Sequence, residues 1–149
     1  MARRGNLRFD KRSIRKFEDR MEAVIHALVF EGENMLSEFG EEAMRMSAEE
    51  VPQDTTALLQ SAYVEEPEYN EDTGKLSIDI GYGGKKDTLN PETLKMASEY
   101  AYEVHEDLNV FHPAGKAKYL EDPINALQSK FSNRLKEWAT AAFAAVKRM

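Results

Sequence analysis

The stretch VPQDTTALLQSAYVEE, residues 51–66, decides the fold, because a helical pattern precedes it and a strand pattern follows it. Pro52 predicts the end of the preceding helix, since the residue before a proline is disfavoured in the α region. Asp54 is expected to cap a short helix over residues 55–61, whose two adjacent leucines turn inward. The competing interpretation is an active-site loop in which Asp54 stands beside hydroxyl nucleophiles. No histidine is near in the sequence to act as a general base, so the stretch favours a structural joint.

On the amino side of residues 51–66, residues 10–50 have apolar side chains spaced by threes and fours, which is typical of an amphipathic helix. The apolar stripe consists of Ile14, Phe17, Met21, Ile25, Leu28, Gly32, Met35, Phe39, Ala43 and Met46. At 1.5 Å per residue, one continuous helix of this length spans about 60 Å. Gly32 could bend the helix or divide it into two, and the sequence leaves open whether the helix is straight or broken there.

On the carboxyl side, two strand patterns over residues 61–69 and 75–82 flank a turn-rich segment, which predicts a β-hairpin. In the second pattern apolar residues alternate with polar or glycine residues, so one face is expected to be buried. Residues 99–106 also alternate and are expected to form a third strand. Between the second and third of these strands, residues 90–98 are expected to form a short helix that begins at Asn90-Pro91.

A second long helix is expected to begin at Asp122, as the N-cap, with Pro123 in its first turn, and to run close to the carboxyl end. The order of elements predicts an α+β fold. The long N-terminal helix and the C-terminal helix should pack on a small antiparallel sheet of three to four strands. A chain of 149 residues is expected to form a single domain, residues 1–149, with residues 1–9 as a basic, flexible N-terminal arm.

The net charge of −7 is unevenly distributed along the chain. Residues 1–16 carry seven basic side chains against one acid, whereas residues 17–79 carry 17 acids and three bases, a net of −14. A nucleic-acid-binding protein needs a basic face across its fold, so this distribution argues against that class. The basic segment is either a solvated tail or an arm that docks on an acidic partner or a second copy. The candidate interaction residues are Arg3, Arg4, Arg8, Lys11 and Arg12, with Lys85 and Lys86 in a glycine-rich loop.

The sequence offers little catalytic chemistry. It has no cysteine, its histidines lack metal-ligand spacing, and no nucleophile elbow, phosphate-binding loop or zinc-protease helix is present. His26 lies in an apolar helical stretch and is expected to be packed or exposed rather than catalytic. His105, Glu106 and His112 flank a long loop and could meet in space, which leaves a small hydrolase or metal-dependent enzyme as an alternative. The expectation is no enzyme, no catalytic or metal-binding residue and no cofactor. No apolar run is long enough for a membrane span.

Three short motifs in order give the chain a resemblance to a known family. The first matches a pattern Ala-Pro-x-Asp-Thr-Gly-x-Leu-x-x-Ser at Pro52, Asp54, Thr55, Leu58 and Ser61. The second consists of Tyr100, Ala101, Val104, His105 and Glu106, and the third of Lys118, Tyr119 and Leu120, with tyrosine in place of phenylalanine. With the helices and hairpin between them, residues 10–148 resemble the tail-completion (tail-to-head joining) neck proteins of long-tailed bacteriophages.

The chain departs from this family at two places. Thr56 replaces the usual glycine, so the backbone there is not expected at positive φ. The segment 83–98 is also longer than usual.

The resemblance implies a structural virion protein of the head–tail connector, with no enzyme activity. Such a protein completes the tail end and joins it to the DNA-filled head as a ring, with a hexamer expected in the virion and a monomer before assembly in the host cytoplasm. The implied partners are other copies of the chain, neighbouring connector or stopper proteins, and tail-tube or tail-terminator proteins. A tail terminator or a minor capsid protein is the alternative within the same phage. An acidic body would let DNA slide through such a ring, because like charge prevents phosphates from binding.

Overall fold

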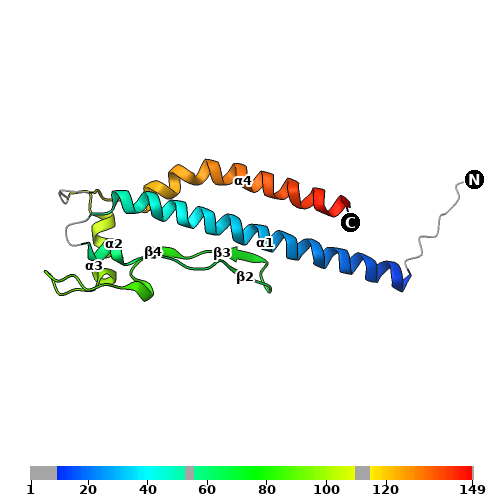
Figure 1. Cartoon of the computed structure of the whole chain (residues 1–149), viewed down its shortest axis with the longest axis horizontal. Coiled ribbons are helices and arrows are strands. Elements are labelled where there is room, and N and C mark those ends of the chain that lie inside the picture. Colours follow the sequence, from blue (N-terminus) through cyan, green and yellow to red (C-terminus); the bar gives the residue numbers. More distant parts are fainter. Residues whose placement is uncertain (1–9, 53–55, 110–114, 149) are drawn as a thin grey trace, which may run out of the picture.

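The computed structural model describes residues 10–52, 56–109 and 115–148. It has an α+β fold, as predicted, in which the long helix α1 (Lys11–Glu50) packs against the antiparallel helix α4 (Glu121–Arg148). A hairpin of four short strands lies along the other side of α1 (Figure 1). Within the described residues, no helix is long and apolar enough to cross a membrane.

Helix α1 is a single helix with a clear beginning and end. Asp10 caps its amino end by accepting a hydrogen bond at Oδ1 from the Ser13 amide, at 2.7 Å. At its carboxyl end Val51 is extended, with φ −64° and ψ 137°, as expected before Pro52. The helix neither bends nor divides at Gly32, where the Leu76 side chain would lie 2.7 Å from an added Cβ. Gly32 therefore makes room for the hairpin rather than a break in the helix.

The hairpin comprises β1 (Ala62–Val64), β2 (Glu68–Asn70), β3 (Lys75–Ser77) and β4 (Ile80–Tyr82). β1 pairs with β4 through Val64 and Ile80, and β2 pairs with β3 through Glu68 and Ser77. Three residues separate the two pairings on one strand and two on the other, so the segment 65–67 contains a one-residue bulge. Pro67 lies in this segment, where its missing amide proton leaves no ladder bond unmade.

The bulge keeps the apolar side of both halves of the hairpin against α1. Val64 and Ile80 face Gly40 of the helix, where an added Cβ would lie 3.2 and 3.1 Å from their methyl groups. In a regular strand Val64 and Tyr69, the partners of Ile80 and Leu76, would face opposite sides, because they are five positions apart and side chains alternate along a strand. The predicted hairpin is therefore confirmed, with an irregularity at its centre.

The expected third strand is wrong, because residues 99–106 belong to the helix α3 (Ala97–Glu106). Ala97, Ala101 and Val104 share the helix face that packs on the core, whereas the alternating pattern would have placed Tyr102 inside. Tyr102 is 76% exposed. All four strands of the described chain lie in the hairpin, in two separate two-stranded ladders.

The expected helix over residues 90–98 is also wrong. The Asn90 side chain accepts hydrogen bonds from the amides of Glu92 and Thr93, at 2.9 and 3.3 Å, and closes a turn instead. The helix starts later, where the Glu99 side chain accepts a bond from the Met96 amide at 2.6 Å.

The most tightly packed part of the molecule lies at the carboxyl end of α1. A cluster of Val51, Leu58, Ala97 and Tyr119 joins α1, the short helix α2 (Ala57–Gln60), α3 and the segment before α4. None of the four side chains is more than 3% exposed. Four segments distant in the sequence therefore meet at one point.

Candidate functional site

Tyr119 is the centre of a group of contacts between α3 and α4, which we call the α3–α4 joint. The joint consists of His105, Glu106, Lys118, Tyr119 and Glu121. The Tyr119 side chain is 1% exposed, and its hydroxyl donates to the Ala101 carbonyl at 2.9 Å. Its ring makes an edge contact with the His105 ring, at a centroid separation of 5.0 Å. Burial raises the pKa of the Tyr119 phenol, so the hydroxyl stays protonated and keeps donating.

A second edge contact connects Tyr119 to the hairpin. The Tyr82 ring lies 5.1 Å from the Tyr119 ring, and the Tyr82 hydroxyl lies 2.7 Å from Oγ of Ser47 in α1. Ser47 is fully buried. The joint is thus continuous with the packing between α1 and the hairpin.

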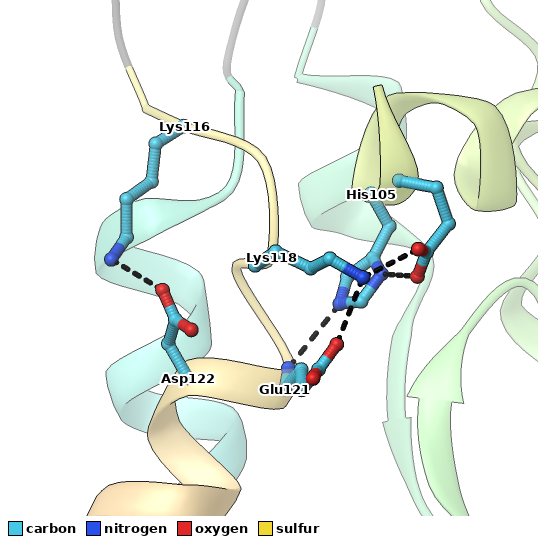
Figure 2. A network of polar contacts seen from close by, with 6 residues as sticks. His105, Lys116, Lys118, Glu121 and Asp122 are labelled. Atoms are coloured by element: carbon cyan, nitrogen blue, oxygen red, sulfur yellow. Dashed lines mark hydrogen bonds and ion pairs between the residues drawn. The ribbon is translucent and has the colours of Figure 1, made fainter. Parts of the chain in front are cut away.

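The charged part of the joint is organised by Lys118. Its ammonium group contacts Oε2 of Glu106 and lies 2.9 Å from Oε2 of Glu121, so it bridges α3 and the first turn of α4 (Figure 2). Hydrogen bonding to Glu106, and then to Glu121, raises the pKa of Lys118. The pKa of Glu106 is lowered by the bond from Lys118 and then by the bond from His105. Both shifts favour the charged forms, so the bridge is ionic around neutral pH.

His105 uses both ring nitrogens within the joint. Nδ1 lies 2.7 Å from Oε1 of Glu106, and Nε2 accepts a hydrogen bond from the Glu121 amide at 3.2 Å (Figure 2). A neutral imidazole with its proton on Nδ1 satisfies both contacts. His105 therefore caps an amide at the amino end of α4, where first-turn amides have no partner within the helix.

His105, Glu106 and Glu121 also offer one ligand atom each within 4.8 Å of one another, which is compatible with a metal site. The contacts argue for a different role. The Lys118 ammonium already bridges the two carboxylates, and the Nε2 lone pair of His105 already receives the Glu121 amide. A metal ion would have to displace both, so the geometry is that of a cap stabilised by an internal cation.

A second lysine connects the carboxyl end of α1 to α4. The Lys116 ammonium lies 2.7 Å from Oδ2 of Asp122 and 3.3 Å from Oε2 of Glu50. The Lys116 amide donates to the Glu50 carbonyl at 2.8 Å. Gly115, at φ +89°, packs against the same turn, and an added Cβ would lie 2.6 Å from the Pro52 nitrogen. The backbone before α4 therefore crosses the end of α1 in direct contact.

Asp122 is not the N-cap that the sequence predicted. Helix α4 begins one residue earlier, at Glu121, and the Asp122 amide already bonds to the Lys118 carbonyl at 3.0 Å. Asp122 instead pairs with Lys116 from within the first turn, where a carboxylate is favoured by the helix dipole.

The first family motif is partly described by the structure. Asp54 and Thr55 lie outside the described residues, so the predicted cap at Asp54 is not tested. Thr56 has φ +60°, which corrects the expectation that its backbone would avoid positive φ. Leu58 is buried, and Ser61 is fully buried with its hydroxyl donating to the Leu58 carbonyl at 2.7 Å. Ser61 therefore holds the turn and is not accessible as a nucleophile.

The candidate interaction residues are not part of the α3–α4 joint. Lys11 and Arg12 are exposed in the first turn of α1. Lys85 and Lys86 are exposed in the 3₁₀ helix η1 (Gly84–Lys86), where Lys85 lies 3.7 Å from Glu65. Arg3, Arg4, Arg8 and His112 lie outside the described residues. His26 is exposed on α1 and has one weak contact, 3.9 Å, with Glu22.

The sequence analysis missed three parts of this site. Ser47 and Tyr82 meet across 35 positions with no local signal, and neither stood out in the sequence. Gly115 could have been noticed, because a glycine after a proline-containing loop commonly marks a backbone that other residues cannot adopt.

Comparison of the chain with protein-family models, with curated proteins and with solved structures gives no match.

Proposed function

We propose that the protein is a structural component of the head–tail connector of a long-tailed bacteriophage, which joins the finished tail to the DNA-filled head as a ring. The observation that carries this proposal is the convergence of the three family motifs. Leu58 from the first motif and Tyr119 from the third share one core cluster. His105 from the second contacts the Tyr119 ring, and Lys118 contacts Glu106.

The convergence supports a structural role because the polar motif residues are used in holding elements together. Ser61 secures α2, His105 caps α4, and Lys118 bridges two helices. A catalytic arrangement would instead leave a nucleophile or base free to reach a substrate. No contact in the joint specifically favours the alternative of a small enzyme.

The outer surface of the hairpin is the candidate wall of the DNA passage. Its exposed acids are Glu66, Glu68, Glu71, Asp72 and Asp79. The single exposed base in the strands of this hairpin is Lys75. Repulsion between these carboxylates and phosphates would keep DNA from binding as it passes. This placement requires the hairpin to face the axis of the ring, and an assembled ring with the hairpin on its outside would refute it.

The test is deletion of the gene followed by electron microscopy of the lysate. The expected result is filled heads and complete tails that remain separate, with joined virions restored when the gene is supplied on a plasmid. Normal virions from the deletion strain would overturn the proposal. Tails of irregular length would overturn it in favour of a tail terminator, and missing or malformed heads in favour of a minor capsid protein.

A further inference from the structure

The amino-terminal part of α1 has an apolar face with no partner among the described residues. Residues 11–22 are all exposed, and Figure 1 shows this end of α1 extending beyond both α4 and the hairpin. The exposed apolar residues of the face are Ile14, Phe17, Met21 and Ile25, with exposed fractions of 45%, 64%, 42% and 47%. Their spacing of three and four places them on one side of the helix. We call residues 11–25 the α1 arm.

A groove between α1 and α4 has the complementary character. Its volume is about 420 Å³, and Met35 and Trp138 lie on its apolar surface. Small residues line its walls: Ala27 from α1, and Ala141, Ala142 and Ala145 from α4. A groove of this size lies within the usual range for sites that take a sizeable apolar group.

The two surfaces also have opposite charge. The α1 arm contains five basic and three acidic side chains, a net of +2. The groove is lined by Glu31, Glu38 and Glu137, with Arg134 as its one basic lining residue, a net of −2. Arg134 is already paired with Glu38 at 2.5 Å, so it does not repel an incoming cation strongly. Complementary charge favours the encounter of the arm with the groove and disfavours the encounter of two arms.

We propose that the α1 arm of one copy docks in the α1–α4 groove of a second copy, with Phe17 entering the groove. The arm cannot fold back into its own groove, because residues 17 and 27 are on one rigid helix and about 15 Å apart along its axis. The contact joins two different surfaces, so it is heterologous and can propagate from copy to copy until a ring closes. The inference rests on the proposed ring and names the contact that would build it.

Cysteine crosslinking tests the contact directly, because the natural chain has no cysteine and introduced thiols are the only ones present. Full-length chains carrying Phe17→Cys are mixed with chains of different tag length carrying Ala141→Cys, at high concentration under mild oxidation. The expected product is the mixed disulfide between the two chains. Asp19→Cys is the matched control, since position 19 lies about 200° around the helix from position 17, and it should not crosslink to Ala141→Cys.

Self-association provides a second readout by light scattering of the purified chain. Phe17→Ala should weaken association about tenfold to a hundredfold, as expected for an aromatic anchor. Phe143→Ala should leave association unchanged, because Phe143 is 72% exposed and lies about 200° around α4 from the groove residues Ala141 and Ala145.

Three results would overturn the proposal: a natural chain that stays monomeric at high concentration, association indifferent to Phe17→Ala, or disulfides between two Phe17→Cys chains in place of the mixed product. The last result would indicate a symmetric pairing of arms. The deletion phenotype is independent of these outcomes. Separated heads and tails without the mixed disulfide would refute the docking alone, and normal virions with the mixed disulfide would refute the connector role alone.

Discussion

The two ends of α1 belong to one helix with one apolar stripe, yet only one end is covered. Ala43, Ser47 and Val51 at the carboxyl end are fully buried, whereas residues 11–22 are exposed throughout. The periodicity of the sequence is the same at both ends, so it predicts a helix with an apolar face and not what covers that face. Burial depends on the other elements, and the amino-terminal tip of α1 extends beyond both α4 and the hairpin (Figure 1).

The largest effect is expected from Gly115→Ala at the carboxyl end of α1. This substitution should lower the free energy of unfolding by about 3–5 kcal/mol. Alanine at φ +89° is strained, and its Cβ would lie 2.6 Å from backbone atoms of Glu50 and Pro52. Urea unfolding followed by circular dichroism measures the change. Gly74→Ala is the matched control, since Gly74 has φ +65° but nothing within 4 Å, and it should cost only about 1 kcal/mol. Equal losses in the two variants would mean that the contact with α1 is unimportant.

Two phenylalanines of the same stripe compare the covered and bare parts of α1 directly. The Phe39 ring lies 4.8 Å from the Phe131 ring of α4, so Phe39→Ala should lower the free energy of unfolding by about 2–3 kcal/mol. Phe17→Ala should change it by less than about 0.5 kcal/mol in the monomer, since exposed substitutions have small effects. A large loss at Phe17 in dilute solution would show that the arm is covered within a single chain.

His105→Ala should lower the free energy of unfolding by about 1–2 kcal/mol, because it removes the cap on the Glu121 amide and the contact with the Tyr119 ring. His26→Ala, on the exposed part of α1, should have no measurable effect. Thermal unfolding of the two variants checks this difference. If addition of zinc stabilised the natural chain but not His105→Ala, the joint would be a metal site after all.

Two substitutions of Lys118 separate the effect of backbone strain on stability from the effect of the lysine charge at the α3–α4 joint. Both Lys118→Ala and Lys118→Gly remove the bridge between Glu106 and Glu121, but glycine also relieves the backbone at φ +58°. The glycine variant should therefore be more stable than the alanine variant, by about 1 kcal/mol. The urea unfolding midpoints of the two variants test this difference in stability. An alanine variant as stable as the glycine variant would contradict a strained backbone at this position.

The smallest effect on stability is expected from protonation of Glu106 as the pH is lowered. The lowered pKa of Glu106 means that its contribution to stability is present above the ordinary glutamate range and is lost as the pH falls through the lowered value. Glu106→Gln should therefore be less stable than the natural chain at neutral pH, and the difference should disappear in strong acid. Unfolding midpoints across this pH range test the sign, and a difference that persists in acid would exclude the charge of Glu106 as its cause.

The sequence predicted the two long helices and the hairpin because each has a local cause. Apolar spacing predicted α1 and α4, Pro52 predicted the end of α1, and residues 70–74 predicted the turn of the hairpin. The failure at α3 has a local cause too. Tyr100, Tyr102 and Val104 alternate as in a strand, and only packing on the core decides that residues 97, 101 and 104 face inward together.

The candidate site was predictable as a set of residues but not as an arrangement. Sequence reasoning singled out His105, Glu106 and Lys118. It did not predict the ion pair between Lys118 and Glu106, because these residues are 12 positions apart and the Lys118 backbone has positive φ. At Thr56 the expectation was wrong, because this threonine has positive φ in the structure although this is a conformation that glycine adopts more easily. Tertiary contacts of this kind leave no trace in local sequence patterns.

The unbroken course of α1 also has a mechanical consequence. A helix of 40 residues is a lever about 60 Å long, and its carboxyl end is held where the backbone at Gly115 crosses it. Tilting such a lever by about 5° displaces its tip by about 5 Å, roughly one helical turn. In the proposed ring, the contacts of α1 with α4, the hairpin and the segment at Gly115 would together determine where the tip of α1 meets the next copy, and thereby the curvature and the number of copies in the closed assembly.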